Sequence, residues 1–359
     1  MSKPRLDVDP LSPTVEWFNT VLAASQIDGR AAGVTAKSIG TGQIGENVRF
    51  SIDYAERGPD APDSIVGKFP SSSESSLMTA KLLGHYRREV KFYQTFDIAQ
   101  EVAPRAYYTD YDEATNTFCL IMQDMAPASQ GDQLAGCKLE DAERAIDAAA
   151  ILHAAHWNDP QLDGFDWLQG TESAPAEAIT PEMTAGFWVG FKERYGNRVT
   201  KDVSDVGDAY AAFLAKGDDR YDGPYTLTHG DYRLDNMLFG GEGAPKRLAV
   251  VDWQTPGKRG PLMDVAYFIG AGLTQADRPK YENALIERYH KRLLARGVTG
   301  YSLDDAKRHY ALFSFYGMAV AFGAAMLVKQ TERGDEMFLT MLRRHAAQAA
   351  ANGGLDLIA

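Results

Sequence analysis

The sequence predicts an α+β fold of two lobes, in which a small N-terminal antiparallel β-sheet lobe with one key helix precedes a larger, mostly helical C-terminal lobe. Strand-like apolar stretches are concentrated early in the 359 residues, and long helical patterns fill most of the rest. The composition changes after Gln123, ahead of Pro127 and a polar, glycine-containing stretch. We therefore expect the two lobes to span residues 1–123 and 124–359.

Composition and charge limit the classes of function. The formal net charge is -12, which argues against non-specific binding of nucleic acid because that binding depends on clustered Lys and Arg. The two cysteines, Cys119 and Cys137, suggest neither a disulfide framework nor a metal cluster. The first residues, MSKPRLDVDPLSP, lack the apolar core of a secretory signal. We expect a cytoplasmic protein, and the sequence makes no obligatory protein partner evident.

One apolar segment has almost the length of a membrane span. Residues Tyr310 to Val328 carry no charge, and about 20 apolar residues are needed to cross a bilayer. The segment is rich in Ala, Gly and Tyr rather than Leu and Ile. Because a helix that is apolar all round also suits the centre of a large helical core, we expect a buried helix and no membrane span.

The N-terminal lobe is expected to begin with a short helix. Ser12 followed by Pro13 is a helix-start signal. An apolar face follows, formed by Trp17, Phe18, Val21 and Leu22. This helix should pack on the first lobe without carrying chemistry.

A glycine-rich motif comes next, with Gly40, Gly42 and Gly45 in the pattern G-x-G-x-x-G. Apolar and polar residues alternate from Val48 to Tyr54, which predicts a strand, whereas the dinucleotide-binding form of the motif must open a helix. A glycine hairpin can cover phosphate groups with backbone amides because no side chain blocks the approach. We assign Gly42 and Gly45 to nucleotide binding; a plain hairpin turn is the alternative.

The same lobe is predicted to contain a buried ion pair. Ser64 to Phe69 has the pattern of a buried strand with a single charge, Lys68. On the helix predicted from Glu74 to Phe96, Glu89 is the only charge of the inward stripe, and an unpaired buried carboxylate costs several kcal/mol. The stripe consists of Leu82, Tyr86, Glu89, Tyr93 and Phe96. We expect Lys68 to pair with Glu89, although a lysine reaching solvent from an edge strand and a surface glutamate are the simpler alternatives.

Two further strands complete a five-stranded sheet. They are predicted around Arg105 to Tyr108 and Phe118 to Met122, on either side of a polar turn. The backbone that follows, at Gln123 and Met125, is expected to form a hinge that meets an adenine ring.

The C-terminal lobe carries mostly helical patterns. Leu139 to Trp157 predicts a core helix, on which His153 and His156 stand three residues apart. Two histidines without a third ligand are more typical of hydrogen-bonded core residues than of a zinc site. Thr180 and Pro181 start an aromatic-rich helix that ends at Gly196 and is mostly core, although Trp188 or Tyr195 could line a pocket.

Three long helical patterns close the chain. They cover roughly Arg278 to Arg296, Leu303 to Lys329 and Glu336 to Ala350. We interpret the Ala-rich tail, HAAQAAANGG, as a fraying helix end.

The most informative stretch runs from His229 to Asp264 and contains HGDYRLDN. Asn236 follows Asp231 by five residues, and Asp252 ends the apolar run Leu248 to Val251, which would deliver its carboxylate at the end of a short strand. An Asp that accepts a hydroxyl proton, followed at this spacing by an Asn and later by an Asp that hold metal ions, is the arrangement of phosphoryl-transfer enzymes. Turn residues and a strand terminator are the alternative interpretation.

These motifs stand in the order found in kinases, and the chain resembles the aminoglycoside phosphotransferase and ecdysteroid-kinase-like families of small-molecule kinases. The resemblance covers roughly Ile39 to Phe268 and is most specific in HGDYRLDN, in VVDW and in the element from Gly260 to Phe268. It implies a protein-kinase-like two-lobe fold that uses ATP and Mg²⁺.

The resemblance also implies a role for each residue of the motifs. Asp231 would be the catalytic base, with Arg233 a cation near the transferred phosphate. Asn236 and Asp252 would be magnesium ligands, and Lys68, held by Glu89, would bind phosphate. Asp264 would support the catalytic loop through its backbone, as would His229 within the same motif.

The acceptor is expected to be a hydroxyl group of a small molecule. Only a short interval separates Asp252 from Asp264, and it has no Ala-Pro-Glu element, so a protein substrate would lose its usual docking segment. A catalytically silent kinase-like domain that binds nucleotide or a partner is the main alternative. A protein kinase and a dinucleotide-binding oxidoreductase are further alternatives, and the latter needs a helix after Gly45.

Overall fold

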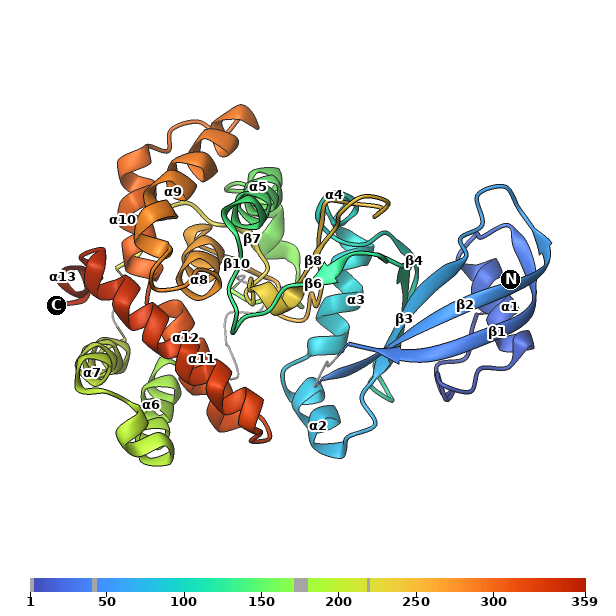
Figure 1. Cartoon of the computed structure of the whole chain (residues 1–359), viewed down its shortest axis with the longest axis horizontal. Coiled ribbons are helices and arrows are strands. Elements are labelled where there is room, and N and C mark those ends of the chain that lie inside the picture. The colour runs from blue at the N-terminus through green and yellow to red at the C-terminus, as the bar shows by residue number, and fades with distance from the viewer. Residues whose placement is uncertain (1–2, 41–43, 171–179, 218–219) are drawn as a thin grey trace. The chain divides into compact units, whose positions relative to one another are not determined.

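The computed structural model describes residues 3–40, 44–170, 180–217 and 220–359. The chain divides into two compact units (Figure 1). The first unit contains Met1–Ala128 together with Gly240–Thr255, and the second contains Ser129–Phe239 and Pro256–Ala359. The chain therefore leaves the first unit, returns to it for one short segment and leaves it again.

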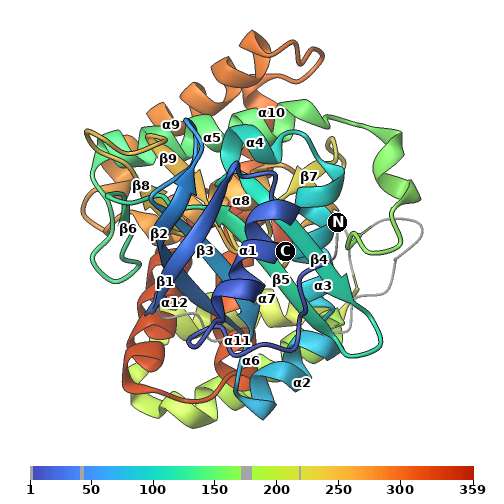
Figure 2. The ribbon, with the colours of Figure 1, turned by 90° about the vertical axis from the view of Figure 1, so that its right-hand side faces the viewer.

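A five-stranded antiparallel sheet forms the centre of the first unit, as predicted (Figure 2). Its order is β1-β2-β3-β5-β4, so the hairpin of β1 and β2 joins the rest through β3. The strands are β1 (Gly29–Ile39), β2 (Gly45–Arg57), β3 (Ser64–Pro70), β4 (Ala106–Asp112) and β5 (Thr117–Gln123).

The two faces of this sheet are covered by different helices. Successive side chains of a strand point to opposite faces, so Cys119 and Ile121 of β5 join the cluster under α1 (Val15–Ala24). Phe118 and Leu120 join the opposite cluster, which contains Tyr86 of α3 (His85–Thr95). Both faces of β5 are therefore buried, which explains its unbroken apolar sequence.

The helix α1 begins two residues later than predicted. Thr14, rather than Ser12, is its N-cap, and the Thr14 hydroxyl accepts a hydrogen bond from the Trp17 amide. Its predicted apolar face is confirmed, because Trp17, Phe18, Val21 and Leu22 are all buried.

The single helix predicted from Glu74 to Phe96 is wrong. The structure has α2 (Glu74–Leu82) and α3, separated at Gly84, whose φ of 65° is a left-handed conformation that suits glycine. The break changes the helical phase, so Leu82 is 75% exposed instead of facing inward. Glu89 on α3 is buried, as predicted.

The first unit is completed by one short helix and by the returning segment, Gly240–Thr255. The α4 helix (Ala99–Val102) packs against β9 (Leu248–Val250), which lies in the returning segment. Lys246 anchors that segment with a hydrogen bond of 2.6 Å from its Nζ atom to the Ala103 carbonyl.

The second unit is mostly helical, as predicted. Short antiparallel ladders lie among the helices, including those between β7 and β10 and between β6 and β8. The strands are β6 (Ser129–Gln130), β7 (Thr226–Thr228), β8 (Met237–Phe239) and β10 (Gly257–Arg259). The α-helices are α5 (Leu139–Ala155), α6 (Pro181–Tyr195), α7 (Lys201–Ala215), α8 (Leu262–Gly272), α9 (Arg278–Ala295), α10 (Leu303–Phe313), α11 (Tyr316–Leu327), α12 (Glu332–Ala351) and α13 (Gly354–Ile358). The described part of this unit also contains the 3-10 turns η1 (Pro160–Gly164), η2 (Gly196–Arg198) and η3 (Leu234–Asn236).

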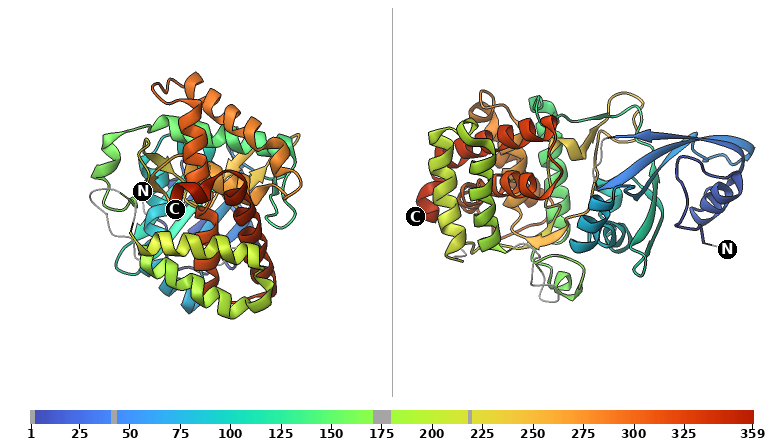
Figure 3. Two further views of the ribbon diagram at one scale, coloured as in Figure 1. Left: turned by 90° about the vertical axis from the view of Figure 1, so that its left-hand side faces the viewer. Right: turned by 90° about the horizontal axis from the view of Figure 1, so that it is seen from below.

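The helices of the second unit pack in pairs. The α6 and α7 helices lie side by side, and α11 packs against both α6 and α12 (Figure 3). The α8 helix is buried between α10, α11 and α12. The sequence analysis found α6, with its Thr180 cap, but it did not predict α7.

The apolar segment in this unit is two helices rather than one. The α10 helix ends at Phe313, and the Ser314 hydroxyl donates to the Ala311 carbonyl where α11 begins. By length and composition alone, Leu303–Leu327 could cross a membrane, but 56% of its most apolar window is buried inside the protein. The prediction of a buried segment is confirmed for α11, whose Met318, Ala321 and Phe322 are fully buried.

The interpretation of the Ala-rich tail as a fraying end is wrong. The α12 helix continues to Ala351, and His345 and Gln348 within the tail are fully buried. They are held in a polar network that includes a hydrogen bond of 2.8 Å between His345 Nδ1 and Gln348 Oε1. The tail packs because its polar residues have partners inside the bundle.

The predicted division into a nucleotide lobe, 1–123, and a catalytic lobe, 124–359, stays a prediction. The compact units differ from it in two respects. The first unit extends to Ala128, and it also includes Gly240–Thr255, which no change in composition marks in the sequence.

Candidate active site

The HGDYRLDN motif forms a loop between β7 and β8 in the second unit. The Asp264 carboxylate, at the start of α8, accepts hydrogen bonds from the backbone amides of His229 at 2.7 Å and Gly230 at 2.9 Å. Both Asp264 and His229 are fully buried. The loop backbone is therefore fixed just before Asp231, which is the contact that structural support by Asp264 requires.

The buried His153 of α5 completes the support for Asp264. Its Nε2 atom lies 3.2 Å from Asp264 Oδ2, and its Nδ1 atom lies 2.7 Å from the Tyr289 hydroxyl. Because a carboxylate only accepts, we assign the hydrogen to Nε2. Burial opposes ionisation of Asp264, but hydrogen bonds from His153 and the His229 amide outweigh it and hold the pKa of this carboxyl below its ordinary value.

The Asp231 carboxylate accepts hydrogen bonds from three side chains. Arg233 Nε lies 3.1 Å from each carboxylate oxygen, Asn236 Nδ2 lies 2.8 Å from Oδ2, and the Tyr267 hydroxyl lies 3.0 Å from Oδ1. The Asp231 side chain is nonetheless 27% exposed. Its orientation is fixed while part of its surface stays accessible to a substrate.

Arg233 bridges two carboxylates. Its Nη1 atom lies 2.7 Å from Asp235 Oδ2, while its Nε atom faces Asp231. Burial disfavours the charge, but the two neighbouring carboxylates outweigh it and raise the pKa of the guanidinium. The Nη2 atom has no hydrogen-bond acceptor among the residues that the structure describes, so it stays available to an anion.

Asn236 offers an amide oxygen. Its Nδ2 atom donates to the carboxylate and to the backbone carbonyl of Asp231, both at 2.8 Å, so Oδ1 is left for another partner. Amide and carboxylate oxygens are hard donors of the kind that Mg²⁺ selects. Asn236 and Asp252 thus have suitable donor atoms, one in each unit.

In the first unit, Lys68 lies between two carboxylates. Its Nζ atom is 2.7 Å from Glu89 Oε2 and 2.8 Å from Asp252 Oδ1. The predicted contact between Lys68 and Glu89 is confirmed. Burial opposes the charge on Lys68, yet Asp252 and Glu89 outweigh it and raise the pKa of this ammonium group. Gln254 adds a hydrogen bond of 3.3 Å to Glu89 Oε2.

Asp252 follows the β9 strand, close to the predicted strand end. Its φ is 66°, an uncommon conformation for a residue other than glycine. Trp253, directly after it, stacks on Phe92 of α3 with ring centroids 3.7 Å apart. This stacking stabilises the backbone at Asp252 in its left-handed conformation. The Asp252 side chain is 38% exposed in this arrangement.

The remaining predicted nucleotide residues are placed as follows. Gly42 lies outside the described residues. A Cβ atom on Gly45 would lie 3.2 Å from Lys68 Cε, so glycine permits a close approach there. Gln123 ends β5 and donates from its amide to the Arg105 carbonyl, and Met125 is buried. Their roles in binding a nucleotide stay predictions.

The zinc alternative finds no support. His156 bonds to Asp159 at 2.9 Å, away from the partners of His153. No group of three or more His, Cys, Asp or Glu side chains suited to a metal occurs in the part of the chain that the structure describes. A magnesium ion needs fewer protein ligands, since water and phosphate supply the rest.

The pocket alternative for the α6 aromatics is also unsupported. Trp188 is 1% exposed, and its Nε1 atom donates to Asp208 at 2.7 Å. Tyr195 is buried and donates to Asp335. Both side chains belong to the core of the second unit.

Sequence reasoning missed three residues around the loop. Tyr267 stands three positions after Asp264 on α8, a spacing that places both on one helical face and could have indicated its contact with Asp231. The Tyr316 hydroxyl donates to the Gly230 carbonyl at 2.6 Å, and no local signal marks it. Asp235 was within the motif but was passed over.

Comparison with solved structures identifies the fold. An aminoglycoside-phosphotransferase-like protein of Ralstonia eutropha matches with a TM-score of 0.56 and 15% identity, over 95% of this chain and 98% of that one. Plasmodium vivax ethanolamine kinase matches with a TM-score of 0.53 and 10% identity, over 93% of this chain and 86% of that one. A microcompartment-associated aminopropanol kinase matches with a TM-score of 0.51 and 12% identity, over 94% of this chain and 99% of that one. At these identities the likeness establishes the fold.

The fold is that of kinase-like phosphotransferases. A model described as the phosphotransferase enzyme family matches residues 75–301, and the chain belongs to that family. The predicted family, fold class and enzyme class are confirmed. No curated protein sequence matches the chain significantly.

Proposed function

We propose that the protein is an ATP- and Mg²⁺-dependent phosphotransferase that moves the γ-phosphate to a hydroxyl group of a small molecule. The observation that carries this proposal is the Asp231 carboxylate, which three donors hold in one orientation on a loop fixed by Asp264. Catalysis of phosphoryl transfer depends mainly on position and charge. A fixed, partly exposed carboxylate meets the first of these needs.

Asp231 would orient the acceptor. Its carboxylate accepts a hydrogen bond from the substrate hydroxyl and takes the proton as the bond between that oxygen and the γ-phosphorus forms. The bond from the γ-phosphorus to the leaving nucleoside diphosphate breaks at the same time. Arg233 lies beside it with a free Nη2 group, which would face the charge on the transferred phosphoryl oxygens.

Lys68 would bind the nucleotide phosphates in the first unit, with Glu89 holding it in place. Asn236 and Asp252 would hold magnesium, which neutralises negative charge on the triphosphate when it is bound. Gly42, Gly45, Gln123 and Met125 would contact the nucleotide through backbone or apolar groups.

A small acceptor is supported by the chain after Asp252. The β10 strand pairs with β7, with Gly257 opposite Thr228, and α8 begins at Leu262. The residues between Asp252 and Asp264 thus form the β10 strand and the start of α8. Because this interval is short and structured, it contains no long segment that could dock a peptide. A cytoplasmic location is in keeping with the free thiols of Cys119 and Cys137.

The test is nucleotide consumption with Mg²⁺ across a panel of small alcohols, followed by ³¹P NMR of the products. Ethanolamine and aminopropanol, for which two structural neighbours are named, are suitable first acceptors. Asp231→Asn should lower kcat by at least roughly 100-fold, as loss of a general base does. Asp205→Asn, on the exposed face of α7, is the matched control.

Two outcomes would reject the proposal. Nucleotide binding without transfer to any acceptor, and without any effect of Asp231→Asn, would favour the catalytically silent domain. Peptides phosphorylated as fast as the small alcohols would favour a protein kinase.

A further inference from the structure

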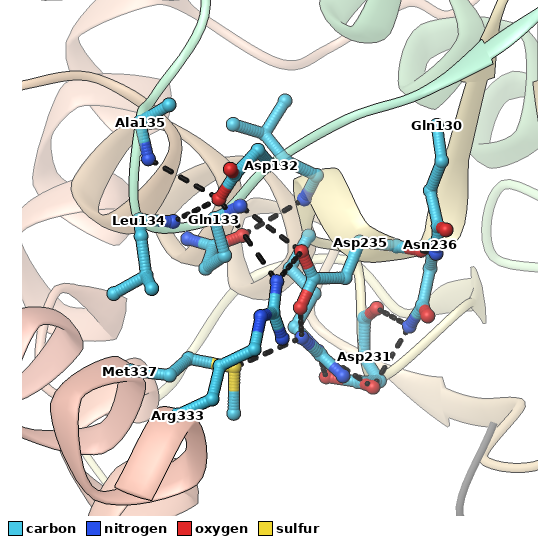
Figure 4. Close-up of polar contacts among 12 residues, drawn as sticks. Gln130, Asp132, Gln133, Leu134, Ala135, Asp231, Asp235, Asn236, Arg333 and Met337 are labelled. Atoms are coloured by element: carbon cyan, nitrogen blue, oxygen red, sulfur yellow. Dashed lines mark hydrogen bonds and ion pairs between the residues drawn. The ribbon is translucent and has the colours of Figure 1, made fainter. Parts of the chain in front are cut away.

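Asp235 lies in the HGDYRLDN motif but was not assigned to the predicted site, and both its side chain and its backbone form hydrogen bonds (Figure 4). Its Oδ2 atom accepts a hydrogen bond from Arg233 Nη1 at 2.7 Å, and its Oδ1 atom accepts one from the backbone N–H of Gln133 at 3.0 Å. Its backbone carbonyl accepts from Gln130 Nε2 at 2.5 Å. The side chain is 13% exposed, so these contacts are largely shielded from water.

The bond to Arg233 determines how that guanidinium is oriented. An arginine beside a single carboxylate can present two parallel N–H groups to it. Here Nε faces Asp231 while Nη1 faces Asp235, so the charge is shared between two acceptors. Met337 Sδ, 3.5 Å from Nη1, closes the same side. Asp235 thus keeps part of the Arg233 charge away from Asp231.

The chain segment that holds Asp235 is itself well anchored. The Leu234 amide donates to Gln133 Oε1 at 2.9 Å, which pairs with the bond from the Gln133 amide to Asp235. The buried Arg344 of α12 donates to the carbonyls of Gln133 and Leu134 at 2.9 Å and 2.8 Å. Asp235 is therefore fastened to a segment that cannot shift easily.

We propose that Asp235 is a positioning residue of the phosphotransfer reaction, which acts through Arg233. It fixes the guanidinium so that Nε steadies Asp231 and Nη2 stays free for the phosphoryl group. This inference rests on the proposed function. Asp235 itself touches neither substrate nor nucleotide in this scheme, so it should affect kcat and leave the KM for the nucleotide unchanged.

The decisive experiment is a double-mutant cycle with full-length protein. Asp235→Asn keeps the shape of the side chain but loses one acceptor, because the amide nitrogen must face either Gln133 or Arg233. We expect kcat to fall roughly 10- to 100-fold, as for the loss of a hydrogen bond to a charged group, with the nucleotide KM within about twofold. In the Arg233→Gln background the same change should alter kcat by less than about twofold.

Asp132→Asn is the matched control. Asp132 lies on the same segment and accepts from the Leu134 amide at 2.8 Å, but its side chain is 56% exposed and does not contact Arg233. Its kcat should stay within about twofold of the wild-type value. A similar loss in both variants would show that the segment matters only for folding, and would overturn the proposal.

The other outcomes are also decisive. The wild-type protein can be active while Asp235→Asn leaves kcat unchanged, or the effects of the two substitutions in the cycle can be additive. Either result would overturn this inference and leave the proposed function standing. A wild-type protein that transfers phosphate to no acceptor would overturn the proposed function and this inference with it. If Asp235→Asn does not fold, Asp235→Glu replaces it: displacing the carboxylate by one methylene should lower kcat similarly, and full activity would contradict the proposal.

Discussion

The hydroxyl of Tyr267 donates a 3.0 Å hydrogen bond to Oδ1 of Asp231. Burial, with the nearby negative charge of Asp231 adding to it, raises the pKa of Tyr267 well above its ordinary value. The phenol therefore remains a hydrogen-bond donor throughout the range in which the enzyme can be assayed. It orients Asp231 without adding a charge.

Tyr267→Phe should lower kcat by roughly 10- to 100-fold, because a hydrogen bond to a charged group is lost. The measurement is steady-state kinetics with the best acceptor of the panel. Tyr195→Phe is the control, since Tyr195 also donates to an aspartate Oδ1, that of Asp335, and does not contact Asp231. Equal losses of activity in the two variants would contradict a specific role for Tyr267.

Lys68→Met should reduce both stability and turnover. The change leaves the Glu89 carboxylate buried without its cation, which costs about 3–5 kcal/mol. Urea unfolding measures this loss, and Lys81→Met, on the exposed part of α2, is the control. Adding Glu89→Gln to Lys68→Met should restore most of the stability but none of the activity. Recovery of activity in the double variant would show that Lys68 does not bind the nucleotide.

Gly317→Ala should destabilise the second unit. A Cβ atom at Gly317 of α11 would lie 1.9 Å from Nε2 of the buried His345 ring. We expect a loss of about 1–3 kcal/mol from overpacking. Gly186→Ala in α6 is the matched helical control, because nothing lies within 4 Å of its added methyl group. That variant should gain about 0.5–1 kcal/mol. Changes of the same sign and size would refute the proposed steric conflict.

His345 should make the folded state sensitive to mild acid. Burial lowers the pKa of His345 to about 4, whereas an unfolded histidine titrates near 6.5. Between these values the unfolded state binds a proton that the folded state does not, so this histidine lowers the free energy of unfolding by about 1.4 kcal/mol per pH unit as the pH falls. Urea unfolding between pH 7 and 5 should show a shallower dependence for His345→Gln. Identical slopes would contradict this origin.

The sequence was sufficient for features that depend on local patterns. Alternating apolar residues predicted the strand β2, and short apolar runs predicted β3 and β5. The cost of an unpaired buried carboxylate predicted the contact between Lys68 and Glu89. The motif spacing predicted that Asp231, Asn236 and Asp252 act in one site, and this grouping stays a prediction. The family assignment confirms the enzyme class alone.

Features that depend on tertiary packing were not predictable in the same way. The break at Gly84 was missed because a single glycine is tolerated in many helices, and only its left-handed φ ends α2. Tyr316 reaches the Gly230 carbonyl from a helix far along the chain. The Ala-rich tail was misread because the partners of Gln348 lie on other helices, including the Ala266 carbonyl of α8.

The return of Gly240–Thr255 to the first unit affects how the protein can be synthesised and dissected. As the ribosome releases the chain, Lys68 and Glu89 emerge long before Asp252, and Phe92 long before its stacking partner Trp253. The first unit can reach its final structure only after Thr255 has been made, so the usual order of N-terminal folding before C-terminal folding is not available to it. A fragment that ends at Ala128 would lack part of its own core, and a single cut cannot separate the two units intact.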